Sequence, residues 1–323
     1  MKTKKKLEVH DDEKTKSIRK FLLHLELEKS LSDNTIQSYN FDLNKFKEFT
    51  AGLNINSFYD TDQKTIEKFI GFAKKNNKAS SMARMLSSLR QFYNYLIKVD
   101  KEKRLKLNPL DFFDSPKMGR KLPDVLTVAE IDKILNQPDV NDTLGLRDKT
   151  ILEVMYACGL RVSEIINLKI PNVLFNDEVV RVFGKGSKER VVPIGASALE
   201  WINIYFTKSR VNLSKPYSED YLFLNWRGRK LSRMAIWDII SKYSKMARIT
   251  KEVHPHIFRH SFATHLIDGG ADLRAVQEML GHSDISTTQI YTQLDMNYLK
   301  YVINEFHPRG EEYMRKEQLK KKQ

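Results

Sequence analysis

The sequence predicts a mainly helical protein of two domains: an N-terminal domain made of helices alone, and a C-terminal α+β domain with a small β-sheet. Four apolar stripes with helical spacing occupy the first third of the chain, and short β-rich segments appear only after residue 178. A chain of 323 residues is also long enough for two ordinary domains, each with its own core.

The four stripes of the first domain repeat apolar residues at the i, i+3, i+4, i+7 spacing of one helix face. Ser32, Asp33 or Asn34 can cap the start of the second helix. We expect this compact helical domain to cover residues 12–105. Its stripes are Ile18, Phe21, Leu22 and Leu25; Ile36, Tyr39, Leu43 and Phe46; Ile66, Phe69, Ile70 and Ala73; and Met82, Met85, Leu86, Leu89, Tyr93 and Leu96, with Arg84 and Arg90 interleaved in the last.

A linker is expected over residues 106–123, where the apolar period lapses among three prolines and clustered charge. A basic linker between two basic domains can follow a phosphate backbone, but a solvated connector explains the same composition equally well.

The second domain is expected over residues 124–310, followed by a charged tail at 311–323. Thr127 can cap its first helix, and a second helix follows from about Gly145 to Ala157. VVRVFG and RVVPIG, separated by KGSKE, are typical of a β-hairpin. Helical spacing then resumes through Trp237, Ile240 and Met246, and in segments that start near His256, Asp272 and Ser286.

Charge and cysteine content narrow the function. The chain has 55 Lys and Arg against 41 Asp and Glu, a net charge of +14, which favours a polyanionic partner without distinguishing nucleic acid from a ribosome or a membrane surface. The single cysteine, Cys158, excludes an intramolecular disulfide and fits a reducing cytoplasm. No apolar run approaches the roughly 20 residues that cross a bilayer, and the basic N-terminus lacks the apolar core of a secretory signal. We therefore expect a cytoplasmic protein.

Several motifs in the second domain carry residues suited to phosphate chemistry. HPHIFRH places His256, Arg259 and His260 at i, i+3, i+4, so that all three lie on one helix face. LGHSDISTTQIYT holds His282 and, nine positions later, Tyr291. CGLRVSE presents Arg161 and Glu164, and GKGSKER sets Lys185 and Lys188 at the tip of the expected hairpin.

Metal-free phosphodiester cleavage needs a nucleophile, stabilisation of the phosphate charge, a base and an acid, and these motifs supply each. The planar fork of arginine binds phosphate in a bidentate manner and keeps its proton, while histidine and lysine can transfer protons. We expect no cofactor and no metal. His256 and His260 have the spacing of a zinc helix, but Ile257 stands where a Glu base would be, and no third ligand is evident.

Each residue taken singly has a simpler explanation. Tyr291 is one of 13 tyrosines, most of which belong to a core or a surface. Histidines on helices are usually satisfied by local hydrogen bonds. The hairpin lysines fit solvated charge at a turn, GKGSK lacks the spacing of a Walker loop, and Glu164 can neutralise Arg161 or cap a helix. Only the ordered set favours catalysis.

The order of these motifs resembles the tyrosine recombinases, and most closely those of the Xer type. The resemblance runs through the whole second domain, including LFLNWRGRKLS, RHSFATHLIDGGADLRAVQEMLGHSDISTTQIYT and the ending HPRG at 307–310. It implies that the first domain is a SAM-like core-binding domain that clamps DNA opposite a tyrosine recombinase catalytic domain. Gln293 stands where members of this family often have His, a change that we expect to be silent.

The resemblance also implies a role for each motif residue. Lys188 is a rival to Lys185 that spacing alone cannot exclude, and it joins Arg84 and Arg90 as an expected DNA contact. The implied roles are nucleophile for Tyr291, phosphate binding for Arg161 and Arg259, transition-state stabilisation for His282, proton transfer with the tyrosine for His256, protonation of the leaving 5′ oxygen for Lys185, and support of the arginines for Glu164 and His260.

The resemblance implies double-stranded DNA as the substrate, with strands exchanged through a Holliday junction. It also implies a tetramer of this chain, alone or with a paralogous recombinase, and a DNA translocase of the division machinery as a partner that activates it. Resolution of chromosome dimers is the expected role. The stretch TTQIYTQLDMNYLKYVINEF would form a terminal helix that docks on a neighbour or, equally, packs in its own domain.

Three alternatives remain at this point. An integrase of a phage or mobile element has the same catalytic set, although those with arm-type sites carry an extra N-terminal domain for which the residues before Ile18 are too few. A DNA-binding protein without catalysis is disfavoured because every expected catalytic position is filled. A relaxing topoisomerase of the same chemistry would act as a monomer without site specificity.

Overall fold

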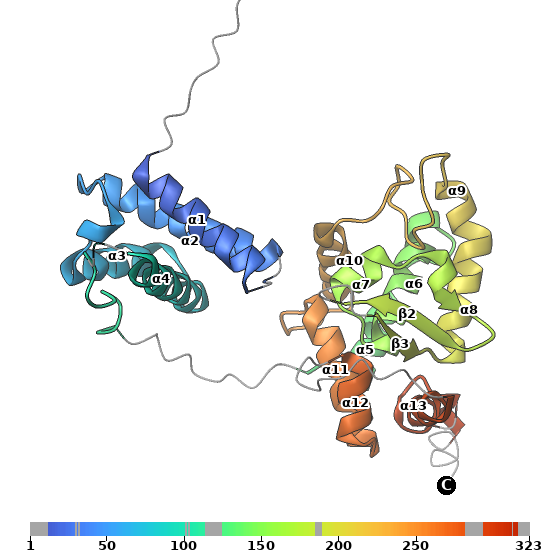
Figure 1. Ribbon diagram of the computed structural model, residues 1–323. Coiled ribbons are helices and arrows are strands. Elements are labelled where there is room, and N and C mark those ends of the chain that lie inside the picture. Colours follow the sequence, from blue (N-terminus) through green and yellow to red (C-terminus); the bar gives the residue numbers. More distant parts are fainter. Residues whose placement is uncertain are drawn as a thin grey trace, which may run out of the picture. The chain divides into compact units, whose positions relative to one another are not determined.

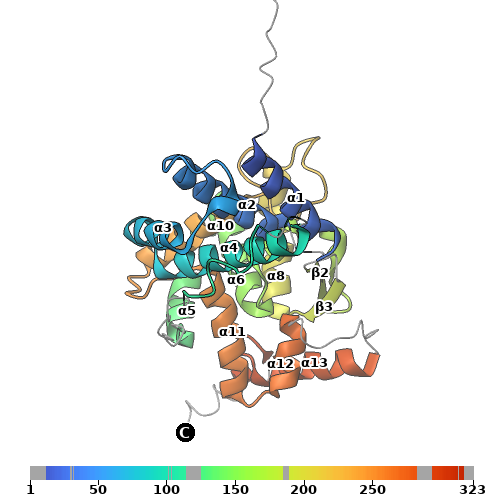
Figure 2. The ribbon, with the colours of Figure 1, turned by 60° about the vertical axis from the view of Figure 1, so that its left-hand side comes forward.

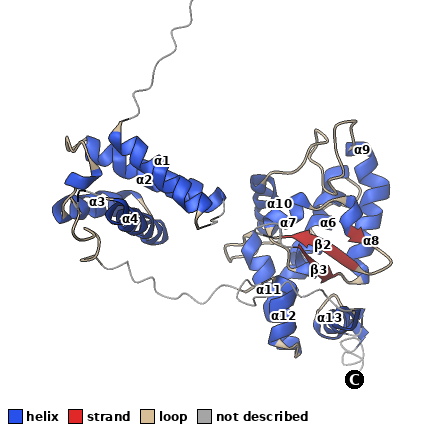
Figure 3. Cartoon of the chain, viewed as in Figure 1, coloured by secondary structure: helices blue, strands red, loops and turns tan. Residues whose placement is uncertain are grey.

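The computed structural model divides the chain into two compact units, Met1–Lys121 and Leu122–Gln323 (Figure 1). It describes residues 12–29, 31, 33–100, 102, 104–113, 125–184, 189–281, 293–311 and 313–315. The expected fold class is confirmed, because the described part is mainly helical and holds one small antiparallel sheet in the second unit (Figure 3). None of the described helices is long and apolar enough to span a membrane.

Each apolar stripe of the N-terminal unit forms one helix. Asp12 caps the first by accepting the N–H of Thr15 at 2.6 Å, and Asp62 caps the third through the N–H of Thr65 at 2.8 Å. The expected cap at Ser32 lies outside the described residues. The helices are α1 (Glu13–Leu27), α2 (Asp33–Ala51), α3 (Gln63–Asn76) and α4 (Ala79–Val99).

The core of this unit is an aromatic cluster contributed by the helices and the segment between α2 and α3. The ring centroids of Phe46 and Phe69 lie 4.8 Å apart, and those of Phe58 and Phe92 lie 5.0 Å apart, both in edge-to-face geometry. Residues 104–113, at the start of the expected linker, pack here too, and Leu110 is fully buried. The apolar residues of this segment do not follow a helical period, and Pro109 interrupts them, so the sequence did not indicate that the segment is part of the core.

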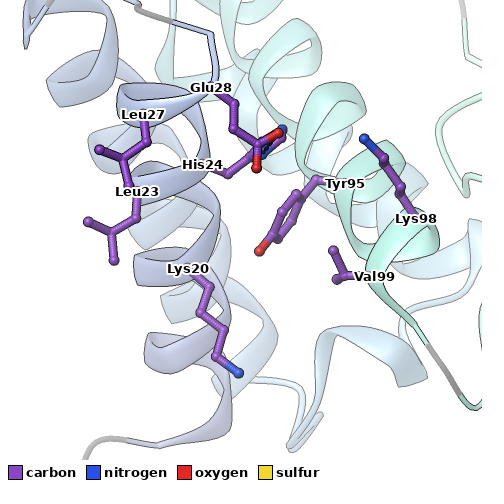
Figure 4. Close-up of a pocket in the computed structure, with 8 residues that line it drawn as sticks. All are labelled: Lys20, Leu23, His24, Leu27, Glu28, Tyr95, Lys98 and Val99. Carbon is purple, nitrogen blue, oxygen red and sulfur yellow. Dashed lines mark ion pairs between the residues drawn. The ribbon is translucent and has the colours of Figure 1, made fainter.

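A shallow hollow lies between α1 and α4 (Figure 4). Nδ1 of His24 lies 3.1 Å from a carboxylate oxygen of Glu28, and the His24 ring centroid lies 4.9 Å from that of Tyr95. The hollow holds none of the residues that the sequence assigns to chemistry. Its lining consists of Lys20, Leu23, His24, Leu27, Glu28, Tyr95, Lys98 and Val99.

The C-terminal unit packs its helices around α6, whose residues from Gly145 to Cys158 are all buried. The sheet is antiparallel in the order β1-β2-β3, and Phe183 pairs with Glu189 nearest the hairpin tip. The strands are β1 (Val173–Leu174), β2 (Val179–Phe183) and β3 (Glu189–Pro193). The helices are α5 (Val128–Leu135), α6 (Thr143–Cys158), α7 (Val162–Asn167), α8 (Ala196–Tyr205), α9 (Val211–Leu213), α10 (Arg233–Met246), α11 (Pro255–Gly269), α12 (Leu273–Leu280) and α13 (Gln293–Phe306).

The terminal helix α13 packs within its own unit, against α11 and α12 (Figure 2). Leu299, Val302 and Ile303 are at most 2% exposed and share a core with residues of those two helices. The HPRG segment follows directly, and Arg309 pairs with Asp132 at 2.9 Å. These three side chains are therefore covered by their own chain, while Tyr298 and Tyr301 of the same helix stay exposed.

Candidate active site

Arg161 is placed by the end of α6 and the start of α7. Gly159 ends α6 in the left-handed conformation (φ 56°), and a Cβ there would lie 2.5 Å from the ring of Phe262, so only glycine fits this turn. Arg161 then precedes α7, and its backbone N–H donates to Oε2 of Glu164 at 2.8 Å. Its guanidinium donates to the other oxygen of Glu164 at 2.9 Å. The side chain stays 36% exposed, so it can reach a ligand.

Arg259 approaches the same place from α11. Its guanidinium donates to the carbonyl oxygens of Gly159, at 2.8 Å, and of Leu280, and lies 4.0 Å from Glu164. Burial, followed by the charge of Arg161, lowers the pKa of Arg259 to about 9. That value is still above neutral pH, and a guanidinium keeps its proton in proteins, so the group is cationic.

A third arginine, Arg190, joins the cluster from β3. It donates to both oxygens of Glu164 and, through Nε, to the carbonyl of Met279 at 3.0 Å, with only 7% of its side chain exposed. Arg190 is not among the residues that the sequence predicted for the site. A signal was present: in ERVVP, strand alternation puts Arg190 on the same buried face as Val192, and a buried arginine needs a partner.

Glu164 is the anion that these arginines share. Burial by itself would raise the pKa of Glu164, but the hydrogen bond and charge of Arg190, then the bonds from Arg161, hold it below its ordinary value. Three guanidiniums around one carboxylate leave an excess of positive charge. The cluster can therefore accept an anionic phosphodiester, with Arg161 as its most exposed donor.

The three arginines that face Glu164 also donate hydrogen bonds to backbone carbonyls at the end of α12. The carbonyls of Met279, Leu280 and Gly281 accept from Arg190, Arg259 and Arg161 respectively. The final carbonyls of a helix have no partner within the helix and carry its negative dipole end, which suits cationic donors. The segment that contains His282 thus begins at the arginine cluster.

Two of the histidines of α11, His256 and His260, belong to the predicted site, and His256 lies close enough to the cluster to be affected by the charges of Arg259 and Arg161. His256 is exposed at the first turn, and its ring centroid is 6.2 Å from that of His254, which stacks on Trp237 at 5.7 Å. Burial, then the charges of His254, Arg259 and Arg161, lower the pKa of His256. His260 is half-buried and has no side-chain hydrogen bond to another described residue.

The structure thus brings together Arg161, Glu164 and Arg259 from the set predicted by the sequence and adds Arg190. Four further predicted site residues, Lys185, Lys188, His282 and Tyr291, lie outside the described residues. Within the described parts of the chain, no three His, Cys, Asp or Glu side chains gather as metal ligands.

The two arginines predicted to contact DNA from the N-terminal unit have partners within it. Arg84 pairs with the buried Asp42 at 2.6 Å. Arg90 donates to the carbonyl of Phe113 at 2.8 Å. Both stabilise the helical unit, and their contact with DNA stays a prediction.

Comparison with known proteins decides the family. Residues 124–298 match the model of the phage integrase family, and residues 18–99 match the phage integrase N-terminal SAM-like domain. The chain is 45% identical to the tyrosine recombinase XerD of Staphylococcus aureus, over 91% of this chain and 99% of that protein. The chain belongs to the tyrosine recombinases of the phage integrase family.

Within this family the recombinase is of the Xer type, and its activity is site-specific cleavage and rejoining of DNA. XerD of Staphylococcus haemolyticus is 43% identical over the same shares of both chains. The fold is shared with XerH bound to a palindromic difH substrate (TM-score 0.68, 23% identity, 90% of this chain and 89% of that one). It is also shared with a lambda integrase dimer bound to a core site (TM-score 0.65, 16% identity, 86% and 97%).

Proposed function

We propose that this recombinase cuts DNA with Tyr291, and that Arg161 and Arg259 bind the scissile phosphate. The observation that carries the proposal is the arrangement of the two arginines: both donate to the end of α12, where the segment containing His282 and Tyr291 begins. Gly281, whose carbonyl accepts from Arg161, directly precedes His282 in the sequence.

The reaction exchanges one phosphate ester for another. The Tyr291 oxygen attacks phosphorus and gives its proton to His256, while the bond to the 5′ oxygen breaks and Lys185 protonates that oxygen. A 3′-phosphotyrosyl link and a free 5′-hydroxyl result. Because an ester bond is kept throughout, a second 5′-hydroxyl can reseal the strand without ATP. His282 and the arginines stabilise the charge that develops on the phosphate.

The proposal extends to the assembly and its setting. We assign the enzyme to a tetramer on two duplexes, exchanging strands through a Holliday junction in the cytoplasm, with this chain alone or with a paralogous recombinase. The chromosomal role follows the XerD relatives and consists of resolving chromosome dimers. Activation by a DNA translocase of the division machinery is part of the same proposal.

The assignment of Tyr291 as the nucleophile is tested by removing its hydroxyl oxygen. The parent protein should form a covalent complex with a nicked duplex that carries its site, recovered by selecting bound fragments from genomic DNA. Tyr291→Phe should bind the duplex with unchanged affinity and form no complex. A covalent complex of the Phe variant would refute the assignment.

The leaving-group acid is tested by Lys185→Ala and Lys188→Ala on duplexes whose scissile 5′ oxygen is replaced by sulfur. A thiolate leaves without a proton, so the variant that lacks the acid should recover its cleavage rate on the sulfur substrate. Recovery in Lys188→Ala instead would transfer the role to Lys188.

The genomic selection itself separates the chromosomal role from the integrase alternative. One strong site near the replication terminus supports dimer resolution. Sites that lie only at the ends of a mobile element would support an integrase instead.

A further inference from the structure

We propose that Arg190 is a positioning residue of the cleavage site: it braces Glu164 and the last turn of α12, and through them holds Arg161 and Arg259 against the scissile phosphate. The inference rests on the proposed function of those two arginines and assigns a role to a residue outside the predicted catalytic set. Arg190 acts through its neighbours, because the side chain is 7% exposed and is enclosed by protein groups.

The contacts of Arg190 use the whole guanidinium. Both terminal nitrogens donate to the two oxygens of Glu164, one of them at 2.8 Å, and Nε donates to the Met279 carbonyl at 3.0 Å. Lysine has no planar fork and cannot make these three bonds in the same plane. With Arg190 in place, the Glu164 carboxylate is fixed where it orients the backbone and side chain of Arg161.

The same side chain supports the turn that ends α12. Gly281 adopts φ 64°, and a Cβ there would lie 2.9 Å from Cδ of Arg190, so the turn and the arginine are in direct contact. At this turn the carbonyl of Leu280 accepts from Arg259, and the carbonyl of Gly281 accepts from Arg161. Loss of Arg190 would therefore loosen both phosphate-binding arginines at once.

The inference distinguishes Arg190 from an ordinary buried arginine. Arg210 is a suitable comparison, because it is 8% exposed and donates only to backbone carbonyls, those of Glu219, Tyr221 and Leu222. Both arginines stabilise the fold, but only Arg190 contacts the residues that hold the phosphate-binding pair.

The experiment measures single-turnover cleavage by the full chain on two nicked duplexes of the selected site. One carries the natural scissile phosphate. The other carries a methylphosphonate there, in which a methyl group replaces one non-bridging oxygen, so that less negative charge needs stabilising in the transition state. The variants are Arg190→Lys, Arg190→Met and the control Arg210→Lys, each checked by its unfolding temperature and by its affinity for the duplex.

We expect both Arg190 variants to cleave the phosphate about 100-fold more slowly, the effect of misplacing a catalytic group by roughly 1 Å. On the methylphosphonate their cleavage rate should fall by less than about tenfold, because less negative charge has to be stabilised by the arginines in its transition state. The affinity of both Arg190 variants for the duplex should be unchanged. In Arg210→Lys, the ratio of the cleavage rates on the two substrates should equal that of the parent protein.

An equal loss on both substrates, or the same pattern in Arg210→Lys, would reduce Arg190 to a residue of the fold and overturn the inference. If Arg190→Met does not fold, Arg190→Lys decides alone, since it retains the charge. Failure of the proposed function would look different: the parent protein itself would form no covalent complex, or Tyr291→Phe would still form one.

Discussion

Glu164 is almost fully buried, with 1% of its side chain exposed, yet its carboxylate faces three guanidiniums. Two of them donate hydrogen bonds, and the third lies at 4.0 Å. A buried charge is tolerated only when it is paired and hydrogen-bonded. Removing this carboxylate would leave buried cations without compensation, so Glu164 contributes to stability as well as to the orientation of Arg161.

Glu164→Gln should lower the free energy of unfolding of the C-terminal unit by about 3–5 kcal/mol at pH 7, the cost of breaking a buried ion pair. Urea unfolding followed by tryptophan fluorescence measures it, since all three tryptophans, Trp201, Trp226 and Trp237, lie in this unit. Glu130→Gln is the control, because Glu130 pairs with Lys251 at a partly exposed site. It should cost no more than about 1 kcal/mol.

The difference in unfolding free energy between the parent protein and Glu164→Gln should depend on pH in a direction that the pKa of Glu164 defines. The folded protein holds the pKa of Glu164 below its ordinary value of 4.5. Its contribution is therefore complete above pH 4.5 and is lost as the pH falls through the folded pKa. The gap between the parent and Glu164→Gln should stay constant from pH 7 to 4.5 and shrink below. A gap that widens on acidification would contradict the ion-pair account.

His256 should produce an acid limb in the pH profile of cleavage. Burial, then the charges of His254, Arg259 and Arg161, hold its pKa below 6.5, so His256 is neutral and able to accept a proton at pH 7. The second-order rate constant at subsaturating enzyme reports the free enzyme. It should fall as the pH drops, with a midpoint below 6.5.

His256→Gln should remove this limb and slow cleavage by about 10²- to 10⁴-fold, the usual contribution of a general base. His24→Gln, in the N-terminal unit, should leave the limb in place. An unchanged limb in His256→Gln would assign the titration to another group.

At the residue scale, motif order predicted three residues that the structure brings together, and the catalytic roles of the set stay a prediction. Arg161, Glu164 and Arg259 were predicted by motif order, and the structure gathers them. Arg190 was missed because a charged residue in a strand is usually solvated. Strand alternation with Val192 indicates its inward face, but its partners come from other elements and only the structure identifies them. The carbonyls of α12 could not be predicted, because every residue type has one.

At the scale of elements, periodicity predicted the longer helices and failed where a helix is short or continues into irregular turns. The stripes of the N-terminal unit appear as four helices. The helices α7, α8 and α9 were not predicted, since α7 and α9 are only six and three residues long, and α8 continues into a π-helical turn over Phe206–Arg210. The sequence also left open whether the terminal helix packs in its own domain, because an apolar helix face indicates that it is buried but not against which surface.

The packing of α13 can be tested by truncating its buried and exposed faces. Ile303→Ala should destabilise the C-terminal unit by about 2–5 kcal/mol, since Ile303 is 2% exposed in a core shared with α11 and α12. Tyr298→Ala, on the same helix but 49% exposed, should change stability by less than about 0.5 kcal/mol. Tryptophan fluorescence during urea unfolding measures both. Equal effects, or a cost that depends on protein concentration, would indicate docking on a neighbour.

At the scale of the whole molecule, charge and the division into two units act together. A net charge of +14 favours phosphate contacts, each of which releases counterions and makes affinity depend on salt. Each unit has a core of its own, and the family of the N-terminal unit matches over residues 18–99. Two linked units that both contact one duplex bind it more tightly than two separate ones, because the first contact raises the effective concentration of the second.

Cutting the connection should therefore weaken binding without unfolding either unit. A protease recognition sequence inserted between residues 114 and 124 leaves both cores intact, and the uncut variant should bind the selected duplex like the parent. After cleavage we expect the affinity, measured at one fixed salt concentration, to fall by about 10²- to 10⁴-fold, as the second contact becomes bimolecular. Unchanged affinity after cutting would show that a single unit carries the binding, and the clamp interpretation of the N-terminal unit would then be wrong.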